Sequence, residues 1–199
     1  MACPPTGGLL VVIDGAKALA AGVKSVFGKL ALVQRCQLHK RRNVLDYLSK
    51  QDRGWVETRM VRAFNHADPD QGLADAHRLA TELEKKWPDA AGSLREGLEE
   101  MFTVSRLGID GRLAKTLTNT NAIESMISIA RTVTARVKRW QNENGSDMRR
   151  RWCAAGMLEA ERSFRRVKGH KQMPRLVAAL TRHAETVTRH NYYQDPIAA

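Results

Sequence analysis

The sequence lacks the features that would place the protein in or across a membrane. Its longest apolar run, Leu9 to Ile13, is far shorter than the roughly 20 residues that a spanning helix needs. The first eight residues contain neither the charged nor the hydrophobic segment of a secretory signal. We therefore expect a cytoplasmic protein with no membrane partner.

Cysteine is also scarce. Cys3, Cys36 and Cys153 are odd in number and far apart in the chain. This pattern argues against a disulfide framework and favours a reducing compartment. Internal repeats and low-complexity segments are missing as well, which excludes a repeat architecture.

Acidic residues are too few to balance the basic ones. The 199 residues include 33 Lys and Arg against 21 Asp and Glu, giving a formal net charge of +12 and a pI near 10.1. Such an excess raises the local concentration of polyanions, so DNA and RNA are the expected partners. The hydrophobic fraction of 43% is ordinary for one or two globular domains.

The first third of the sequence predicts a strand, a helix and a second strand. Leu9 to Ile13 is β-prone and apolar on both faces, as in a buried parallel strand. Apolar residues recur at helical spacing over residues 16–27, which predicts a helix, and a second short strand is expected over Leu30 to Val33. Because two strands form too small a sheet on their own, we expect further strands from an N-terminal part that the chain lacks.

The remainder predicts helices. Asp68 and Pro69 form a typical helix start, and Pro88 is expected to end that helix. The segments with helical character are residues 41–48, 55–64, 68–87, 94–102, 122–140, 147–167 and 174–186. The fold class is therefore α/β and predominantly helical. The expected divisions are residues 1–8, 9–41, 42–117 (a helical insertion), 118–168 and 169–199.

Two acidic residues lie where catalytic carboxylates occur in α/β proteins. Asp14 ends the first strand, and this end of a parallel sheet is where ligands collect. Glu124 lies one turn into a helix and shares a face with Ser128 and Arg131. Taken singly, each is better explained as a turn or helix-capping residue, with Asn121 as a capping partner of Glu124.

Cys36 and His39 are two potential metal ligands three residues apart. A zinc site needs four ligands, and no second Cys/His pair of matching spacing exists in the sequence. A packing or hydrogen-bonding role is therefore favoured for both. The adjoining basic run, Lys40 to Arg42, is a candidate phosphate-contacting patch.

Three motifs together resemble the mutator-type family of bacterial insertion-sequence transposases. They are residues 12–17 (VIDGAK), 34–40 (QRCQLHK) and 118–125 (TNTNAIES), in this order and followed by an arginine-rich helix. The resemblance covers about Leu9 to Leu180. It implies an RNase H-like catalytic fold with a helical insertion before the final Glu.

The resemblance also implies a site and its cofactor. Two Asp and one Glu of the family bind two Mg²⁺ ions for DNA strand cleavage and transfer. Asp14 matches the second Asp and Glu124 matches the Glu. Cys36 and His39 match a Cys-x-x-His motif whose implied role is structural or DNA-proximal rather than metal-binding. The basic residues expected to contact DNA are Lys40, Arg41, Arg42, Arg131, Arg136, Lys138 and Arg139.

The chain departs from the family pattern at its start. The first catalytic Asp and its strand should precede Asp14, but residues 1–8 do not resemble the family. Three interpretations follow. The chain is an inactive transposase fragment, or one half of an enzyme completed by a separately encoded N-terminal part. Alternatively, it is a non-catalytic basic helical protein that binds DNA or RNA. A homo-oligomer is compatible with each.

Overall fold

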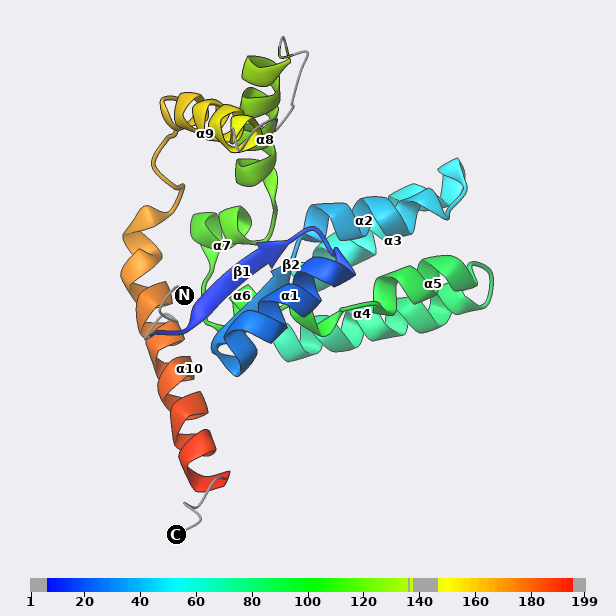
Figure 1. Cartoon of the computed structure of the whole chain (residues 1–199). Coiled ribbons are helices and arrows are strands. Elements are labelled where there is room, and N and C mark those ends of the chain that lie inside the picture. The colour runs from blue at the N-terminus through cyan, green and yellow to red at the C-terminus, as the bar shows by residue number, and fades with distance from the viewer. Residues whose placement is uncertain (1–6, 136, 138–146, 195–199) are drawn as a thin grey trace. The chain divides into compact units, whose positions relative to one another are not determined.

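The chain folds as two compact units. The computed structural model describes residues 7–135, 137 and 147–194 (Figure 1). The first unit comprises Met1–Asn119 and Lys168–Ala199, and the second comprises Thr120–Val167. Both units consist mainly of helices, and the first also contains one small parallel sheet. The prediction of a predominantly helical α/β fold is thus confirmed. No helix in the described ranges is long and apolar enough to cross a membrane.

The sheet has the predicted strand–helix–strand order. Strand β1 (Leu9–Ile13) leads through helix α1 (Lys17–Phe27) and the 3-10 turn η1 (Gly28–Leu30) to β2 (Ala31–Arg35). The strands are parallel, with Leu9 opposite Ala31 and Ile13 opposite Arg35. The apolar stripe of α1 covers one sheet face, where Ala20 and Val23 pack against Ile13 and Val33.

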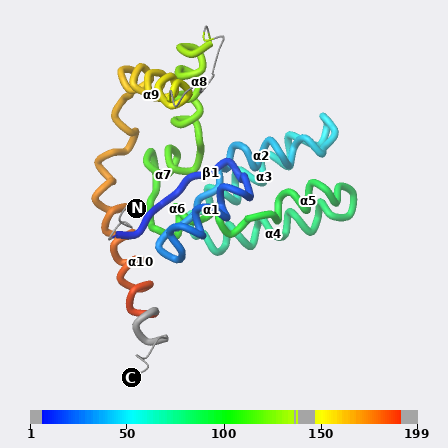
Figure 2. The backbone as a smooth tube through the Cα atoms, in the orientation of Figure 1, coloured from blue at the N-terminus to red at the C-terminus, as the bar shows by residue number. Residues whose placement is uncertain are grey.

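Short helices form the insertion that follows β2. Their bounds are α2 (Gln37–Asp46), α3 (Lys50–Phe64), α4 (Pro69–Glu84), α5 (Pro88–Arg95), η2 (Glu99–Met101), α6 (Thr103–Arg106) and α7 (Gly111–Leu117). Helices α2, α3, α4 and α5 pack against one another around a core that includes Val56, Met60, Leu79, Leu83 and Phe102. The smooth trace shows these four helices lying side by side (Figure 2).

The helix bounds agree with the sequence prediction at some ends and not at others. Asp68 caps α4 as expected, since its Oδ1 accepts hydrogen bonds from the N–H groups of Asp70 and Gln71. Pro88, however, does not end this helix. It occupies the first turn of α5, where proline fits because it has no N–H to leave unpaired.

The second face of the sheet is covered by elements distant in sequence. After η3 (His170–Gln172), helix α10 (Met173–Gln194) places Leu176 and Leu180 against Leu10 of β1. Val104 and Leu113, from α6 and α7, complete this cluster. Both faces of the sheet are therefore packed, as the apolar run on both faces of β1 predicted.

The second unit contains a closely packed helical hairpin. Its helices are α8 (Asn121–Thr134) and α9 (Met148–Glu161), both shorter than predicted. Gly156 faces Ala130, and a Cβ atom at Gly156 would lie 3.1 Å from the Ala130 Cα and Cβ atoms. The absence of a side chain at Gly156 thus permits the close approach of α8 and α9.

Candidate active site and nucleic-acid interface

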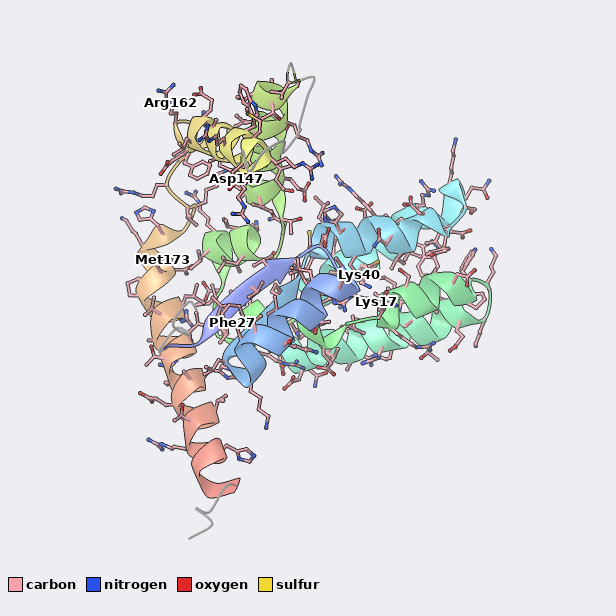
Figure 3. The ribbon with its side chains drawn as sticks, in the orientation of Figure 1. Lys17, Phe27, Lys40, Asp147, Arg162 and Met173 are labelled. Atoms are coloured by element: carbon pink, nitrogen blue, oxygen red, sulfur yellow. The ribbon has the colours of Figure 1, made fainter. Side chains whose placement is uncertain are left out.

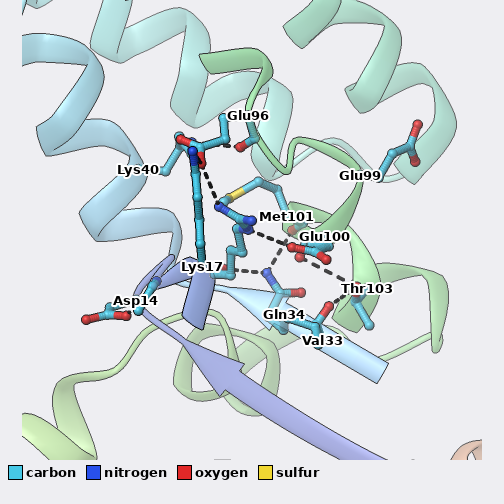
Figure 4. A network of polar contacts seen from close by, with 12 residues as sticks. Asp14, Lys17, Val33, Gln34, Lys40, Glu96, Glu99, Glu100, Met101 and Thr103 are labelled. Atoms are coloured by element: carbon cyan, nitrogen blue, oxygen red, sulfur yellow. Dashed lines mark hydrogen bonds and ion pairs between the residues drawn. The ribbon is translucent and has the colours of Figure 1, made fainter. Parts of the chain in front are cut away.

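Asp14 lies directly after β1, at the carboxyl end of the parallel sheet. Its side chain is exposed, and its Oδ1 accepts a hydrogen bond from the Ala16 N–H at 3.1 Å. Gly15 follows with a φ of +112°, a conformation that favours glycine, and the chain then enters α1. This turn holds the carboxylate at the sheet edge. In Figure 4 the Asp14 carboxylate points away from the neighbouring polar network.

That network is centred on Arg35 at the end of β2. The buried Arg35 guanidinium donates from Nε to Glu100 Oε2 at 2.6 Å, and its Nη1 lies 3.9 Å from Glu96 Oε1. Lys17, on α1, forms an ion pair with Glu96 at 3.4 Å (Figure 4). Lys24, on the same helix, pairs with Glu100 at 3.8 Å. Two carboxylates of the insertion thus offset the charge of one buried and two exposed cations.

Gln34 joins the sheet to the insertion by hydrogen bonds alone. Its side chain is fully buried, and Nε2 donates to the carbonyl oxygens of Arg35 at 2.8 Å and Met101 at 3.0 Å. Its Oε1 accepts from the Val104 N–H at 2.9 Å. Because both amide hydrogens and the oxygen have partners, this buried polar side chain carries no desolvation penalty from an unpaired group.

Lys40 lies inside the first unit rather than on its surface. Its Nζ donates to the Ser93 carbonyl at 2.6 Å and the Glu96 carbonyl at 2.8 Å, at the carboxyl end of α5. Burial lowers the pKa of Lys40 from 10.5 to about 8; Glu96 opposes this shift and Arg35 adds to it. The ammonium proposed from sequence to contact DNA therefore binds two main-chain carbonyl groups of α5.

Cys36 and His39 are brought together at the start of α2. The buried Cys36 caps this helix, with its Sγ accepting from the His39 N–H at 3.5 Å. His39 Nδ1 lies 3.2 Å from the same sulfur. The two residues thus contact each other locally, and their structural role stays a prediction from sequence. In the described part of the chain, no three His, Cys, Asp or Glu side chains are grouped to hold a metal ion.

The two other residues of the basic run have different surroundings. Arg41 is half-buried and pairs with Glu57 at 3.2 Å. Arg42 is exposed on α2. Lys40 instead shares the inner face of this helix with Val44, four residues on, so that the run is divided between the interior and the surface.

Glu124 lies in the second unit, whereas Asp14 lies in the first. The Glu124 side chain is exposed in the first turn of α8, and its Oε1 accepts a hydrogen bond from the buried Thr120 hydroxyl. The Glu124 N–H donates to the Thr120 carbonyl at 3.0 Å. Thr120 is thus a hydrogen-bonding partner that the sequence prediction, which named Asn121, missed.

Basic residues are concentrated in the second unit. It contains 10 Lys and Arg against 5 Asp and Glu in 48 residues, whereas residues 37–117 contain 14 against 13. Arg131 is exposed in the last turn of α8, and Arg150 lies on α9. Figure 3 labels Asp147 and Arg162, the residues that flank α9. Arg136, Lys138 and Arg139 lie outside the described residues.

Several Lys and Arg residues of the helical insertion form ion pairs within it. Its ion pairs join Arg59 to Glu82, Arg78 to Asp75, Lys86 to Asp52, Arg95 to Glu84, and Arg106 to Asp70 and Glu99. The net charge of +12 is therefore carried mainly outside this segment. A polyanion would experience the strongest attraction at the second unit and at the parts of the first unit outside the insertion.

Sequence reasoning missed the buried network. The predicted strand ended at Val33, so Gln34 and Arg35 were placed after it, and Glu96 and Glu100 were not singled out. A signal existed in the pattern: two long polar side chains end a strand whose first three residues are apolar. Buried polar residues of this kind need partners from elsewhere in the chain.

Comparison with known proteins identifies the family. A family model described as "Transposase, Mutator family" matches residues 6–150. Comparison with curated proteins and with solved structures found no significant match. The matched segment includes the whole sheet, the insertion and helix α8, and so contains Asp14, Cys36, His39 and Glu124. Since this match covers more than half of the sequence, the chain belongs to the Mutator family of transposases.

Proposed function

We propose that the chain serves DNA transposition as the DNA-binding and metal-binding part of a transposase. The observation that carries this proposal is the family match over residues 6–150, which includes both candidate carboxylates. The strand–helix–strand unit is, in this proposal, part of an RNase H-like catalytic fold. DNA, comprising transposon ends and target, is the partner that the family membership and the basic charge both favour.

Asp14 and Glu124 are the proposed ligands of Mg²⁺. Carboxylate oxygens are the ligands that Mg²⁺ prefers, and both side chains are exposed. Each has one oxygen oriented by a local hydrogen bond, from the Ala16 N–H or from the Thr120 hydroxyl. Mg²⁺, when bound, stabilises charge on a phosphoryl group and activates a water or hydroxyl nucleophile.

A third carboxylate is required for cleavage in this proposal. The resemblance implies a trio of carboxylates, of which Asp14 and Glu124 match two. We propose that the third is supplied from outside these 199 residues, so that the 199 residues alone bind metal weakly and do not transfer strands. Arg41, Arg42 and Arg131, with Arg136, Lys138 and Arg139, would then hold the DNA phosphates.

The ligand assignment is tested by Mn²⁺ binding, followed by electron paramagnetic resonance. Asp14→Asn and Glu124→Gln should each weaken binding, because each removes one anionic oxygen ligand. Asp46→Asn, which neutralises an exposed carboxylate at the end of α2, is the matched control and should bind as the wild type does. Equal binding by all four proteins would refute the assignment.

Strand cleavage is tested with the same proteins on a DNA end in Mg²⁺ or Mn²⁺. The wild-type chain alone should show no strand transfer. Robust cleavage by this chain would contradict the need for a third carboxylate from elsewhere.

A second candidate is nucleic-acid binding without catalysis. The observation that favours it is that Asp14 and Glu124 both make local hydrogen bonds, from the Ala16 N–H and the Thr120 hydroxyl, which need no metal ion. In that case Asp14→Ala and Glu124→Ala should change neither DNA binding nor the effect of Mg²⁺ on it. A Mg²⁺-dependent difference in DNA affinity between these variants and the wild type would exclude this candidate.

A further inference from the structure

Helix α7 and the start of α10 carry a group of exposed cations that the proposed function does not use. We call it the α7–α10 surface, and its members are Arg112, Lys115, Lys168, Lys171 and Arg175. All five belong to the first unit. Residues 111–119 and 168–184 contain no Asp or Glu, so the sequence around these cations supplies no acidic neighbour.

Close packing holds the two segments of this surface together. Gly169 has a φ of +80°, and a Cβ atom there would collide with the main-chain nitrogen of Leu113. Leu113 of α7 and Leu176 of α10 belong to one buried cluster. The Thr116 hydroxyl donates to the Lys168 carbonyl at 3.4 Å. Cations from segments distant in sequence are therefore fixed on one part of the first unit.

Most of this positive charge lacks an acidic partner. Asp110 pairs with Arg175 at 3.3 Å and accepts from Gln172 Nε2 at 2.8 Å. Among the residues that the structure describes, no ion pair reaches the other four members, Arg112, Lys115, Lys168 and Lys171. Like charges held close together repel one another, and a bound polyanion relieves this repulsion.

A pocket of about 330 Å³ adjoins these cations. Lys115 and Arg175 line it, together with the apolar residues Phe64, Ile109 and Ala114. This volume is at the lower end of the range of small-molecule sites, roughly 300–1,000 Å³. A base stacked inside a duplex cannot enter such a pocket, whereas an unstacked base can. Apolar walls beside two cations suit a nucleotide, which combines a flat base with an anionic phosphate.

The pocket also lies close to the end of the sheet that carries Asp14. Gln37 and Thr118 both line it, and the Gln37 N–H donates to the Thr118 carbonyl at 2.9 Å. The residue before Gln37 is Cys36, whose N–H donates to the Ile13 carbonyl at 2.7 Å. A DNA strand held near Asp14 is therefore close to the pocket.

We propose that the α7–α10 surface binds single-stranded DNA, with one unstacked base in the pocket. The proposal rests on DNA being the substrate, as in the proposed function. The phosphates would pair with the cations of the surface, and the apolar walls would contact the base. A nick made beside Asp14 frees a strand end that can leave the duplex, which would supply this ligand.

The cations are tested with a fluorescent oligodeoxythymidine, followed by anisotropy at several salt concentrations. Lys115→Gln with Lys171→Gln should raise its Kd roughly tenfold and make the logarithmic salt slope shallower by about 1.4, from two lost phosphate contacts at 0.7 each. Affinity for a duplex of equal length should change less than twofold. The matched control is Lys50→Gln with Lys85→Gln, which removes two exposed lysines of the insertion and should bind as the wild type does. Equal losses for single strand and duplex would overturn the proposal.

The pocket is tested by filling it without a change of charge. Ala67 is exposed and lines the pocket, so Ala67→Trp should weaken oligodeoxythymidine binding and leave duplex binding unchanged. Unchanged single-strand binding in this variant would refute the placement of a base. Mn²⁺ binding at Asp14 and Glu124 should be the same in all these variants as in the wild type. Failure of the metal assignment and failure of the single-strand site are therefore separate results.

Discussion

The Lys40 ammonium has three hydrogens, and two of them bond the carbonyl oxygens of Ser93 and Glu96. A neutral amine keeps two hydrogens, which suffice for the same two acceptors. Deprotonation therefore removes a buried charge without breaking these bonds. This is the physical reason that the pKa of about 8 is compatible with an unchanged fold.

Stability should consequently rise with pH above 8. Between the folded pKa of about 8 and the usual 10.5, the unfolded chain binds more protons than the folded chain, so the free energy of unfolding increases. The increase from Lys40 is at most about 3 kcal/mol, from roughly 1.4 kcal/mol per pKa unit. Urea unfolding of wild type and Lys40→Met from pH 7 to 10.5 measures it. The free energy of unfolding of the wild type should rise relative to that of Lys40→Met over this interval. Parallel curves of this free energy against pH would disprove the lowered pKa of Lys40.

Gly97 provides a second test at the scale of one residue. Its φ of +61° disfavours a side chain, and a Cβ atom there would collide with the Arg35 guanidinium. We expect Gly97→Ala to destabilise the protein by roughly 2–4 kcal/mol, through backbone strain and displacement of the buried cation from Glu100.

Gly92→Ala is the matched control for this substitution. Gly92 lies within α5 with open space around it, so alanine there should be neutral or stabilising by up to about 1 kcal/mol. Thermal unfolding compares the two. A Gly97→Ala variant as stable as Gly92→Ala would contradict the packing described for Arg35.

Among the elements, those with strong local signals were predictable from sequence. The continuous apolar run predicted β1, and the Asp68–Pro69 pair predicted the start of α4. Pro88 was misjudged because proline both ends helices and begins them, and only the packing of α5 decides between these roles. The sequence also did not determine whether the Lys40 side chain points into the core or to the surface, since a run of basic residues does not reveal which of its members is buried.

Gly156 of α9 and Ala130 of α8 form a close contact between small residues in the helical hairpin. We expect Gly156→Val to force these helices apart, because a Cβ atom already lies 3.1 Å from Ala130 and two further methyl groups have no space. Amide exchange in α8 and α9 should accelerate while that in α4 stays slow. Gly54→Val, at a helical glycine of α3 with open surroundings, is the control. Unchanged exchange in Gly156→Val would show that the hairpin does not need this contact.

For the whole molecule, the placement of charge matters more than its total. Residues 37–117 are nearly neutral and internally ion-paired, whereas the second unit has twice as many basic as acidic residues. DNA affinity should accordingly depend on where a cation is removed. With about 6 phosphate contacts, the logarithmic salt slope of the wild type should be roughly −5.

Two fourfold alanine variants with the same change in net charge test this dependence. The first removes Arg131, Arg136, Lys138 and Arg139, and the second removes Arg59, Arg78, Arg95 and Arg106. The first should make the salt slope shallower by about 3.6 and weaken binding strongly, because each lost phosphate contact releases about 0.9 fewer counterions. The second should leave the slope near that of the wild type, as measured by fluorescence anisotropy from low to moderate salt. Equal losses would mean that binding responds to net charge alone.

The hydrogen bonds of Gln34 have a consequence for how the chain can vary. The polypeptide leaves the sheet after Arg35 and returns at Glu100 and Met101, within reach of the same two side chains. The two ends of the intervening helical segment therefore lie side by side, and both are joined to the sheet at Gln34 and Arg35. Helices of this segment could be lengthened, shortened or exchanged without moving β1 or β2, provided that Gln34 and Arg35 keep these contacts.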